Sequence, residues 1–524
     1  MDSQDEDECK RRLWWTRAEA VAVVVPAAVM LALGLWGLDR GGMWGDEGVT
    51  FLVGRRTVPQ IWRLLHGVDA VHGLYYLFMH VVLAVRPDEV ALRLPSVCGA
   101  TATAGLVAAL GVRLARPRVG LWAGLLYAIT PLTGHYAQEG RSYALVAAGV
   151  AGATLLLVRA LDERPGRGRS WWPYGAVLAV TFVLHEFAVL VLCAHALTLA
   201  AARVPRAVWA GWGRAVGVAG GVLLPLAWVS QRQSGQVAWL RTPDWDTTER
   251  LAREFLAVAP TGVVFWTSVL LILVGLGAGR LAAVALPLLV VPPVLLLTVS
   301  QFRPLFHERY VLYALAGAPL LAAAGADRLV GVMGRLRLRS PAPPVALAGV
   351  LTVAVAFLHG LPTYRNDRSP AHRPENLAAV SALAGREMRP GDPVLFLPSF
   401  WRVTALAYPG PFVGARDMAL GESGSGSGTL SGREVAPGEL RQRLAAVDRV
   451  WIVAQSNLLP SRWVPGDPTD QVKLDVVDEE FARRQEYVRG RVKLGLYVRR
   501  MPPPVLTGAP ASPPPTVPPR PARR

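Results

Sequence analysis

Long apolar runs separated by short polar connections recur along residues 18–361. A helix needs about 20 mostly apolar residues to cross a bilayer. The runs therefore predict a polytopic α-helical membrane protein with about 11 transmembrane helices. The predicted spans are 18–38, 93–115, 119–137, 142–160, 171–184, 187–202, 215–230, 261–277, 281–299, 310–328 and 342–361.

Two apolar stretches do not have the length of one span. The stretch 171–202 is too long for a single helix, and His185-Glu186 interrupts it, which favours two short spans. The run 72–85 is short and carries two histidines, which favours a helix lying in the membrane interface. With these assignments arginine gathers in alternate connections, as the positive-inside rule requires. The rule then predicts a cytoplasmic N-terminus and a C-terminus outside the plasma membrane.

Composition agrees with a membrane protein and argues against nucleic-acid binding. Apolar residues make up 52% of the chain and charged residues 18%, whereas soluble domains carry about 25% charged residues. The formal net charge is +17, and arginines in short loops facing an anionic leaflet explain most of it. The sequence lacks the Cys/His spacing of a zinc finger, so it gives no support for nucleic acid as a partner. Cys9, Cys98 and Cys193 form no CxxC motif. The abundant Ala, Arg, Gly and Pro suggest a GC-rich bacterial genome.

The segments outside the predicted spans indicate two further structured regions. Residues 49–67 place apolar residues at helical spacing with basic residues between them, which predicts an amphipathic helix in the interface. Beyond residue 361, buried strands are predicted at 394–398, 447–454 and 490–500, in a small extracytoplasmic α/β domain. The Gly/Ser-rich stretch 421–432 predicts a flexible loop. The predicted domains are a cytoplasmic tail 1–17, a transmembrane module 18–361 with a first outer loop 39–92, the α/β domain 362–500 and a Pro-rich disordered tail 501–524.

Ionisable residues fall on the outer side in four separate connections of the predicted bundle. For the adjacent acids Asp46 and Glu47, a solvated turn at a helix end is the simplest interpretation. Four polar connections on one rim, flanked by tyrosines, instead predict a pocket that opens to the outside. The sequence has no P-loop, GxGxxG or GxSxG motif, so it predicts no nucleotide site or serine nucleophile. The polar residues are Asp46, Glu47, Gln138, Glu139, Arg141, His185, Glu186, His307, Glu308 and Arg309.

Several motifs, taken in order, resemble a known family. "WGDEG" follows the first span, "HGLYYLF" follows the amphipathic segment, and "ALRLPSVCGA" opens the second span. "LLYAITPLTGHYAQEGRSYAL" joins the third and fourth spans, and "PLFHERYVLYALAGAPLL" begins a late one. This order is similar to that of the GT-C glycosyltransferases, in particular protein O-mannosyltransferases, lipid A aminoarabinose transferases and bacterial RgtA/B/C/D-like enzymes. The resemblance covers roughly residues 14–330.

The sequence departs from the family pattern at two places. The family's His-x-Pro before "LYYL" is His72-Gly73-Leu74 here, which loosens the expected position of His72. The family's "QEAR-x-Y" appears as "QEGRSY", which keeps Glu139, Arg141 and Tyr143.

The resemblance implies an integral-membrane transferase. It would move a sugar such as mannose from a polyprenyl-phosphate donor to a protein, glycan or lipid acceptor outside the membrane. Asp46 would be the general base, with Glu47 as its catalytic neighbour. Arg141, Arg309 or Arg93 would contact the lipid phosphate. Glu139 would hold the acceptor, support the base or, with Asp46, bind a divalent metal (Mg or Mn). The other candidate substrate-binding residues are His72, Tyr76, Gln138, Tyr143, His185, Glu186, His307 and Tyr310.

Alternative interpretations stay open at this point. A transporter or flippase for a lipid carrier would show internal repeats and ionisable groups near the midplane, whereas here no clear repeat is visible and the acids gather on one rim. A non-catalytic membrane scaffold that presents the α/β domain is the other alternative. Arg93 could simply cap its span near the headgroups, and Tyr76 could be an interface aromatic. His185 and His307 could be ordinary hydrogen-bonding residues.

Overall fold

The computed structural model of the protein describes residues 16–162, 170–259, 262–335, 342–370, 375–456, 465 and 467–500. The predicted Pro-rich tail 501–524 lies outside the described residues, as do residues 1–15 of the predicted N-terminal tail, with Cys9. Cys98 and Cys193 are free, exposed thiols.

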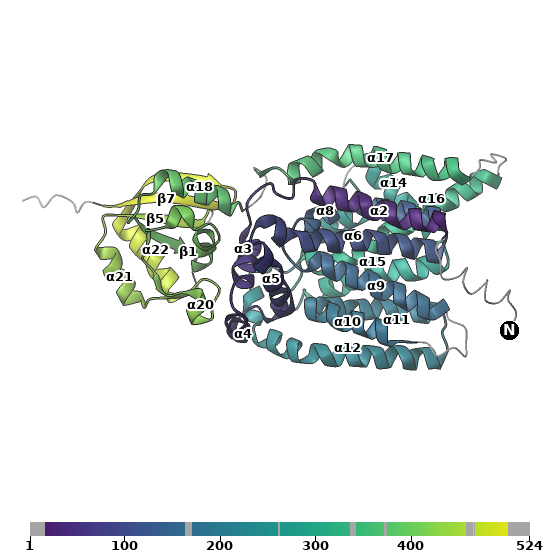
Figure 1. Cartoon of the computed structure of the whole chain (residues 1–524), viewed down its shortest axis with the longest axis horizontal. Coiled ribbons are helices and arrows are strands. Elements are labelled where there is room, and N and C mark those ends of the chain that lie inside the picture. Colours follow the sequence, from purple (N-terminus) through teal and green to yellow (C-terminus); the bar gives the residue numbers. More distant parts are fainter. Residues whose placement is uncertain are drawn as a thin grey trace, which may run out of the picture.

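Long apolar helices lie side by side in the larger part of the molecule (Figure 1). Every predicted span falls on one helix or on two consecutive helices. Seven of the described helices are long and apolar enough to cross a membrane, by length and composition. The polytopic helical class is therefore confirmed, and the count of eleven crossings stays a prediction. The helices are α2 (Arg17–Leu35), α6 (Glu89–Leu114), α7 (Pro117–Ala128), α8 (Pro131–Ala137), α9 (Tyr143–Asp162), α10 (Trp172–Leu184), η2 (Glu186–Leu190), α11 (Val191–Ala201), α12 (Arg206–Arg232), α14 (Gly262–Gly275), α15 (Arg280–Val299), η4 (Glu308–Ala316), α16 (Gly317–Arg335) and α17 (Ala342–Asp367).

Local signals in the sequence set where helices begin and how closely they pack. Thr16 caps α2 in a capping box with Glu19, and Asp88 accepts from the Ala91 N–H at 2.9 Å to cap α6. Helices α6 and α7 approach closely because their contact uses glycine: a Cβ on Gly120 would lie 2.4 Å from the Ala108 carbonyl oxygen.

The first outer loop forms short helices across one end of the bundle (Figure 1). These are α3 (Gly45–Gly54), α4 (Val58–Gly67), η1 (Ala70–His72) and α5 (Gly73–Val85). The amphipathic segment predicted as one helix over 49–67 is thus two helices, because Thr57 forms a capping box with Gln60 and starts α4 afresh. Helix α4 buries Ile61 and Leu64 and exposes Trp62, as an interfacial helix does.

The C-terminal region contains a five-stranded sheet beyond these short helices (Figure 1). Its order is β2-β1-β5-β7-β6, with β2, β1 and β5 parallel and β7 and β6 antiparallel to their neighbours. The three predicted strands correspond to β1, β5 and β7, so the small α/β domain is confirmed. The bounds are β1 (Pro393–Leu397), β2 (Arg416–Asp417), β5 (Arg449–Gln455), β6 (Phe481–Arg489) and β7 (Val492–Arg499), with helices α18 (Leu377–Glu387), α19 (Val403–Ala407), α21 (Pro437–Ala445) and α22 (Pro468–Glu480).

The Gly/Ser-rich stretch 421–432, predicted as a flexible loop, is folded. Ser423 caps a short helix, α20 (Gly424–Ser427), between strands β3 (Leu420–Glu422) and β4 (Arg433–Glu434). Arg56 donates to the Thr429 carbonyl at 2.8 Å. This contact orders the loop against the α3–α4 corner, which composition alone does not indicate.

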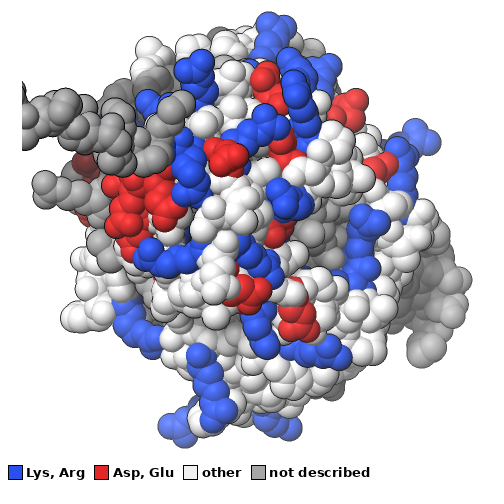
Figure 2. Space-filling model, turned by 90° about the vertical axis from the view of Figure 1, so that its left-hand side faces the viewer, with Lys and Arg blue, Asp and Glu red and all other residues white. Residues whose placement is uncertain are grey.

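The first outer loop and the α/β domain share one apolar core. Side chains of α3–α5 such as Phe51 and Met79 belong to the same buried cluster as Leu377, Trp401 and Val403. Helix α19 packs on α3. The α/β domain is therefore fastened to the end of the bundle at which the predicted outer residues lie. Figure 2 views the molecule from this end, where Lys and Arg are interspersed with Asp and Glu.

Candidate active site

Helix α3 turns its two adjacent acids to different surroundings. The Glu47 side chain has no exposed surface, and it forms a two-bonded ion pair with the equally buried Arg93. Arg93 Nε donates to Glu47 Oε1 at 2.9 Å and Nη2 donates to Oε2 at 2.8 Å. The N–H of Gly140 also donates to Glu47 Oε1 at 2.9 Å. Glu47 therefore connects α3 to α6 and to the turn at Gly140, and its role as a catalytic neighbour stays a prediction.

Arg93 fixes the chain that leads into α3. Besides Glu47, its guanidinium donates to the carbonyls of Leu38 at 3.0 Å and Gly42 at 3.2 Å. These bonds use a charged donor in a dry environment, where such bonds are strong. In the structure Arg93 anchors residues 38–42, and its expected place at the donor phosphate or as a cap near the headgroups stays a prediction.

Asp46 is the acid that keeps access to solvent. Its side chain is 27% exposed, and its Oδ2 lies 3.1 Å from Arg309 Nη1 and 4.0 Å from Arg141 Nη2. The interpretation as a solvated turn does not describe this environment, because two buried arginines face the carboxylate, one from η4 and one from the turn between α8 and α9. The residues predicted to line a pocket therefore gather around Asp46.

Glu139 lies on the other side of Arg309. Its Oε1 is 3.9 Å from Arg309 Nη1, and within the described part of the chain neither carboxylate oxygen has a hydrogen-bond partner. Burial raises the pKa of Glu139 to about 7, and Arg309 only partly offsets that rise. The turn that carries Glu139 is held by Ser96, whose hydroxyl lies 2.6 Å from the Glu139 carbonyl oxygen and 2.9 Å from that of Arg141.

Arg141 is held by neutral partners. Its Nη2 donates to His72 Nε2 at 2.7 Å, and its Nη1 donates to the Thr50 hydroxyl at 3.3 Å. Because a guanidinium can only donate, His72 accepts through Nε2, so its ring is neutral with the proton on Nδ1. Burial, with Arg309 and Arg141 nearby, also lowers the pKa of His185 to about 3, so that ring is neutral as well. His72 and His185 therefore add no positive charge beside Arg141 and Arg309.

Aromatic rings form the wall behind Arg309. The guanidinium carbon lies 5.3 Å from the ring centre of Tyr143, and 5.7 Å from the rings of Tyr310 and Trp44. The His185 ring is 4.9 Å from that of Tyr310. This wall holds the guanidinium in place and leaves its Nε without a hydrogen-bond partner among the described residues.

The other predicted site residues lie around this centre and bond to the protein itself. Gln138 donates to the carbonyls of Gly34 and Trp36 at the end of α2. Tyr76 donates to Asp69 at 2.7 Å, and Glu186 accepts from Ser230 at 2.9 Å. His307 Nδ1 lies 3.1 Å from Glu308 Oε2. These contacts give Gln138, Tyr76 and Glu186 structural partners.

Glu375, which the sequence did not single out, reaches the same place from the α/β domain. Its Oε2 accepts from the N–H of Gly45 at 3.1 Å, one residue before Asp46. The two residues are 330 positions apart in the chain. The sequence carries no local signal for this contact, because "RPENLAAV" has the ordinary pattern of a helix start.

The residues around Asp46 do not fit a divalent metal well. The position between Asp46 and Glu139 is taken by a cation already, since Arg309 Nη1 approaches both. No group of three or more His, Cys, Asp or Glu side chains that could hold a metal is found among the described residues. Mg²⁺ and Ca²⁺ sites are built from oxygen ligands, and a dication here would also face Arg141.

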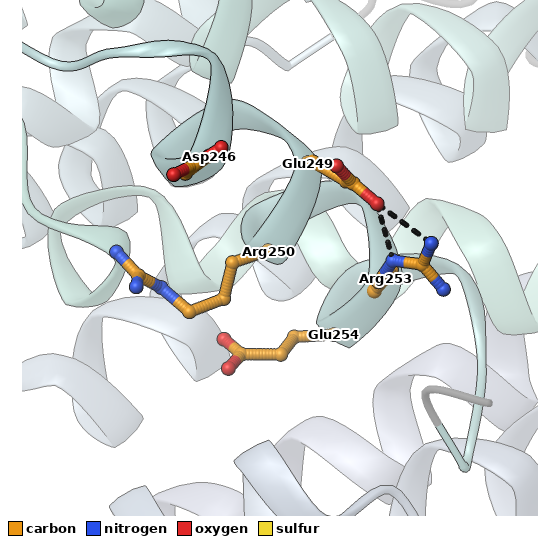
Figure 3. Close-up of a pocket in the computed structure, with 5 residues that line it drawn as sticks. All are labelled: Asp246, Glu249, Arg250, Arg253 and Glu254. Carbon is orange, nitrogen blue, oxygen red and sulfur yellow. Dashed lines mark hydrogen bonds and ion pairs between the residues drawn. The ribbon is translucent and has the colours of Figure 1, made fainter.

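A surface hollow elsewhere in the molecule is unrelated to this centre. It is lined by five charged residues of one helix, α13 (Trp245–Leu256), and Figure 3 shows Glu249 paired with Arg253 there. The lining residues are Asp246, Glu249, Arg250, Arg253 and Glu254. None of them contributes to the cluster around Asp46.

Comparison with known proteins agrees with the motif order. Residues 73–229 match the family model described as dolichyl-phosphate-mannose-protein mannosyltransferase. The structure is similar to apo ArnT from Cupriavidus metallidurans, with 13% identity, 91% of this chain and 97% of that chain covered, and a TM-score of 0.56. It also matches the apo oligosaccharyltransferase of Archaeoglobus fulgidus, with 12% identity, 90% and 74% coverage, and a TM-score of 0.47. No curated protein sequence matches significantly.

The fold and the match together define the class of this protein. It is a polytopic membrane protein with the fold of the GT-C glycosyltransferases, so the resemblance is confirmed. Within that class, the matching segment runs from the start of α5 to near the C-terminal end of α12 and includes Arg93, Glu139, Arg141 and His185.

Proposed function

We propose that the protein is an integral-membrane glycosyltransferase that moves a sugar from a polyprenyl-phosphate donor to an acceptor hydroxyl outside the membrane. The observation that carries this proposal is the contact of Asp46 with Arg309. A solvent-accessible carboxylate lies beside two buried arginines, at one end of an apolar helix bundle. A base for the acceptor and cations for the leaving phosphate are thus within one pocket.

The positions of these residues support the following reaction. The acceptor oxygen attacks the anomeric carbon of the donor sugar while Asp46 removes the acceptor proton. The bond between the anomeric carbon and the phosphate oxygen breaks, and its electron pair leaves with the polyprenyl phosphate. Negative charge grows on that oxygen, so donors that are already in place stabilise the transition state. Arg309 and Arg141 are these donors, and each keeps its Nε free of partners among the described residues.

The protonation of Glu139 matters for binding an anionic lipid. Arg309, Arg141 and Asp46 together carry a net charge of +1, and a protonated Glu139 adds no negative charge beside them. Because the pKa of Glu139 is raised to about 7, the protonated form is well populated near neutral pH. We infer that Glu139 lies beside the donor as a neutral or readily neutralised group and hydrogen-bonds the sugar or the acceptor.

Mannose is the first sugar to test, because the matching family model is described by a mannosyl donor. Undecaprenyl phosphate is the first carrier to test, since ArnT from Cupriavidus metallidurans has been solved with it bound. Purified protein is incubated with radiolabelled polyprenyl-phosphate mannose, and in parallel with the matching arabinose and galactose donors, together with cell-envelope acceptors. Label that moves to an acceptor in wild type but not in Asp46→Asn supports the proposal. No transfer from any donor, with all donors shown to bind, would overturn it.

The proposed side of the membrane has its own test. We propose that the α/β domain and the pocket lie outside the plasma membrane and that the N-terminus is cytoplasmic. The positive-inside rule supports this orientation, and α2 starts at the end of the bundle away from the α/β domain (Figure 1). A reporter that is active only outside the cytoplasm, fused after Arg500 at the end of the described domain, is expected to be active. A cytoplasmic signal would reverse the orientation.

A further inference from the structure

The α/β domain holds the backbone that leads into α3. The Met43 N–H donates to the Tyr408 hydroxyl at 2.8 Å, and the Leu377 N–H donates to the Met43 carbonyl at 3.1 Å. The Gly45 N–H donates to Glu375 Oε2 at 3.1 Å. Three successive contacts therefore come from one domain and end at the residue before Asp46.

Glu375 acts as the cap of α3 from a distant part of the chain. The N-cap residue of α3 is Trp44, whose side chain makes no capping bond in the described structure. The first N–H groups of a helix need an acceptor from outside, and a carboxylate also interacts favourably with the positive end of the helix dipole. Glu375 supplies the hydrogen-bond acceptor and the negative charge to the helix turn that carries Asp46.

A side chain at residue 45 would force its neighbours from the α/β domain to shift. A Cβ there would lie 2.8 Å from Glu375 Oε2 and 2.9 Å from Phe400 Cζ. Glycine at position 45 thus lets the carboxylate of Glu375 reach the helix backbone directly. The contact is part of a closely packed interface.

Charges from three other elements face Glu375. They are Asp46 on α3, Arg309 on η4 and Arg491 in the turn between β6 and β7. Asp46 itself faces Arg309 and Arg141, with Glu139 beyond Arg309. Burial raises the pKa of Glu375, as does the like charge of Asp46. The carboxylates of Glu375 and Asp46 are thus electrostatically coupled as well as linked through the backbone.

We propose that Glu375 is a positioning residue through which the α/β domain sets the place of Asp46 and the charge beside it. This inference rests on the proposed function, in which Asp46 is the base. Glu375 fixes the first turn of α3 by accepting from Gly45, and it places a negative charge near the Asp46 carboxylate. The α/β domain then contributes a positioning residue to the transferase site.

Two substitutions of Glu375 separate the effect of its hydrogen bond to Gly45 from the effect of its negative charge. Glu375→Gln keeps an oxygen that can accept from Gly45 and removes the charge. Glu375→Ala removes both. Glu439→Gln is the matched control, because Glu439 is an exposed acid of the same domain paired only with Arg443 in the described contacts. Each variant of the full chain is purified in detergent, its thermal unfolding is recorded, and its kcat, KM for donor and pH–rate profile are measured.

The expected pattern follows from the two roles. Glu375→Ala is expected to lower kcat by about tenfold or more with little change in the KM for donor, since a misplaced base lowers the rate of the chemical step. Glu375→Gln is expected to restore kcat to within about threefold of wild type and to move the acid limb of the profile to lower pH. Glu439→Gln is expected to behave as wild type.

Other results overturn the inference. It fails if Glu375→Ala keeps wild-type kcat, or if Glu375→Gln is as slow as Glu375→Ala with an unmoved acid limb. If Glu375→Ala does not fold, the pH–rate profile of Glu375→Gln decides alone, and an unmoved acid limb overturns the coupling. Failure of the proposed function looks different, because wild type and Asp46→Asn would then transfer sugar equally or not at all.

Discussion

The carboxylate of Glu47 and the guanidinium of Arg93 form a two-bonded ion pair with no exposed surface, one residue away from the solvent-accessible Asp46. Neighbouring residues on a helix point about 100° apart. Asp46 therefore enters the pocket while Glu47 points into the protein. The pair sets the orientation of α3 against α6, and so determines where Asp46 lies.

The first prediction is that substitution of Glu47 lowers the stability of the folded protein, and that any loss of activity follows from this loss of stability. Glu47→Gln leaves a buried Arg93 without its counter-charge, and breaking such a pair typically costs about 3–5 kcal/mol. We expect a strongly lowered thermal unfolding temperature in detergent and poor recovery from membranes. Glu439→Gln, which alters an exposed pair, is the control. A Glu47→Gln protein with wild-type stability and no activity would instead make Glu47 a catalytic acid.

Asp46→Asn is expected to leave the stability of the protein unchanged and to slow the transfer reaction. The amide keeps the shape and the hydrogen-bonding capacity of the side chain, and Asp46 is partly exposed, so the protein should fold normally. The variant cannot accept the acceptor's proton, and loss of a general base costs about 10²–10⁴-fold in rate. Donor binding should be near normal. Transfer at the wild-type rate would remove Asp46 from the mechanism.

Arg309→Lys tests the recognition of phosphate. Lysine keeps the charge but loses the planar fork and the stacking that Tyr143 and Tyr310 offer. We expect stable protein with a donor KM raised about tenfold and a lowered kcat, because lysine cannot make the planar, two-bonded contact to the leaving phosphate. The same substitution at Arg328, which donates to the Gly277 carbonyl, is the comparison. Equal kinetics in both variants would contradict a role of Arg309 at the phosphate.

The transfer reaction is expected to continue in the presence of a chelator. Arg309 already occupies the position between Asp46 and Glu139. Activity is measured after dialysis against EDTA and again after Mg²⁺ or Mn²⁺ is added back. Loss of activity with EDTA and recovery with metal would show that a dication displaces Arg309 in the working enzyme.

The sequence predicted the elements because membrane helices follow a local rule. An apolar run of sufficient length becomes a helix wherever it stands, and the motif order supplied the residues that meet at the pocket. Strand β6 was missed because most of its residues are exposed and show no apolar alternation. The eleven predicted segments needed no knowledge of tertiary contacts.

The parts of the site that could not be predicted depend on distant contacts. Nothing in "WGDEG" tells which acid meets Arg93 and which meets Arg309, since that depends on how α3 is rotated against α6 and η4. Glu375 lies 330 positions from Gly45, and no periodicity links them. Gln138 resembles a site residue by its neighbours, yet it bonds to carbonyls at the end of α2.

The last prediction concerns pH and Glu139. Burial raises the pKa of Glu139 to about 7 in the folded protein, well above that of an unfolded glutamate. Between those two values the folded state binds more protons than the unfolded state, so this group makes the protein less stable as the pH rises toward 7. Its favourable contribution is fully present only below the unfolded pKa. Thermal unfolding of the substrate-free protein is recorded from pH 5 to pH 8 for wild type and Glu139→Gln. The difference between the two curves isolates Glu139, because the other titrating groups are common to both. Wild type should lose stability relative to Glu139→Gln across this range, and parallel curves would show that Glu139 titrates as an ordinary exposed acid.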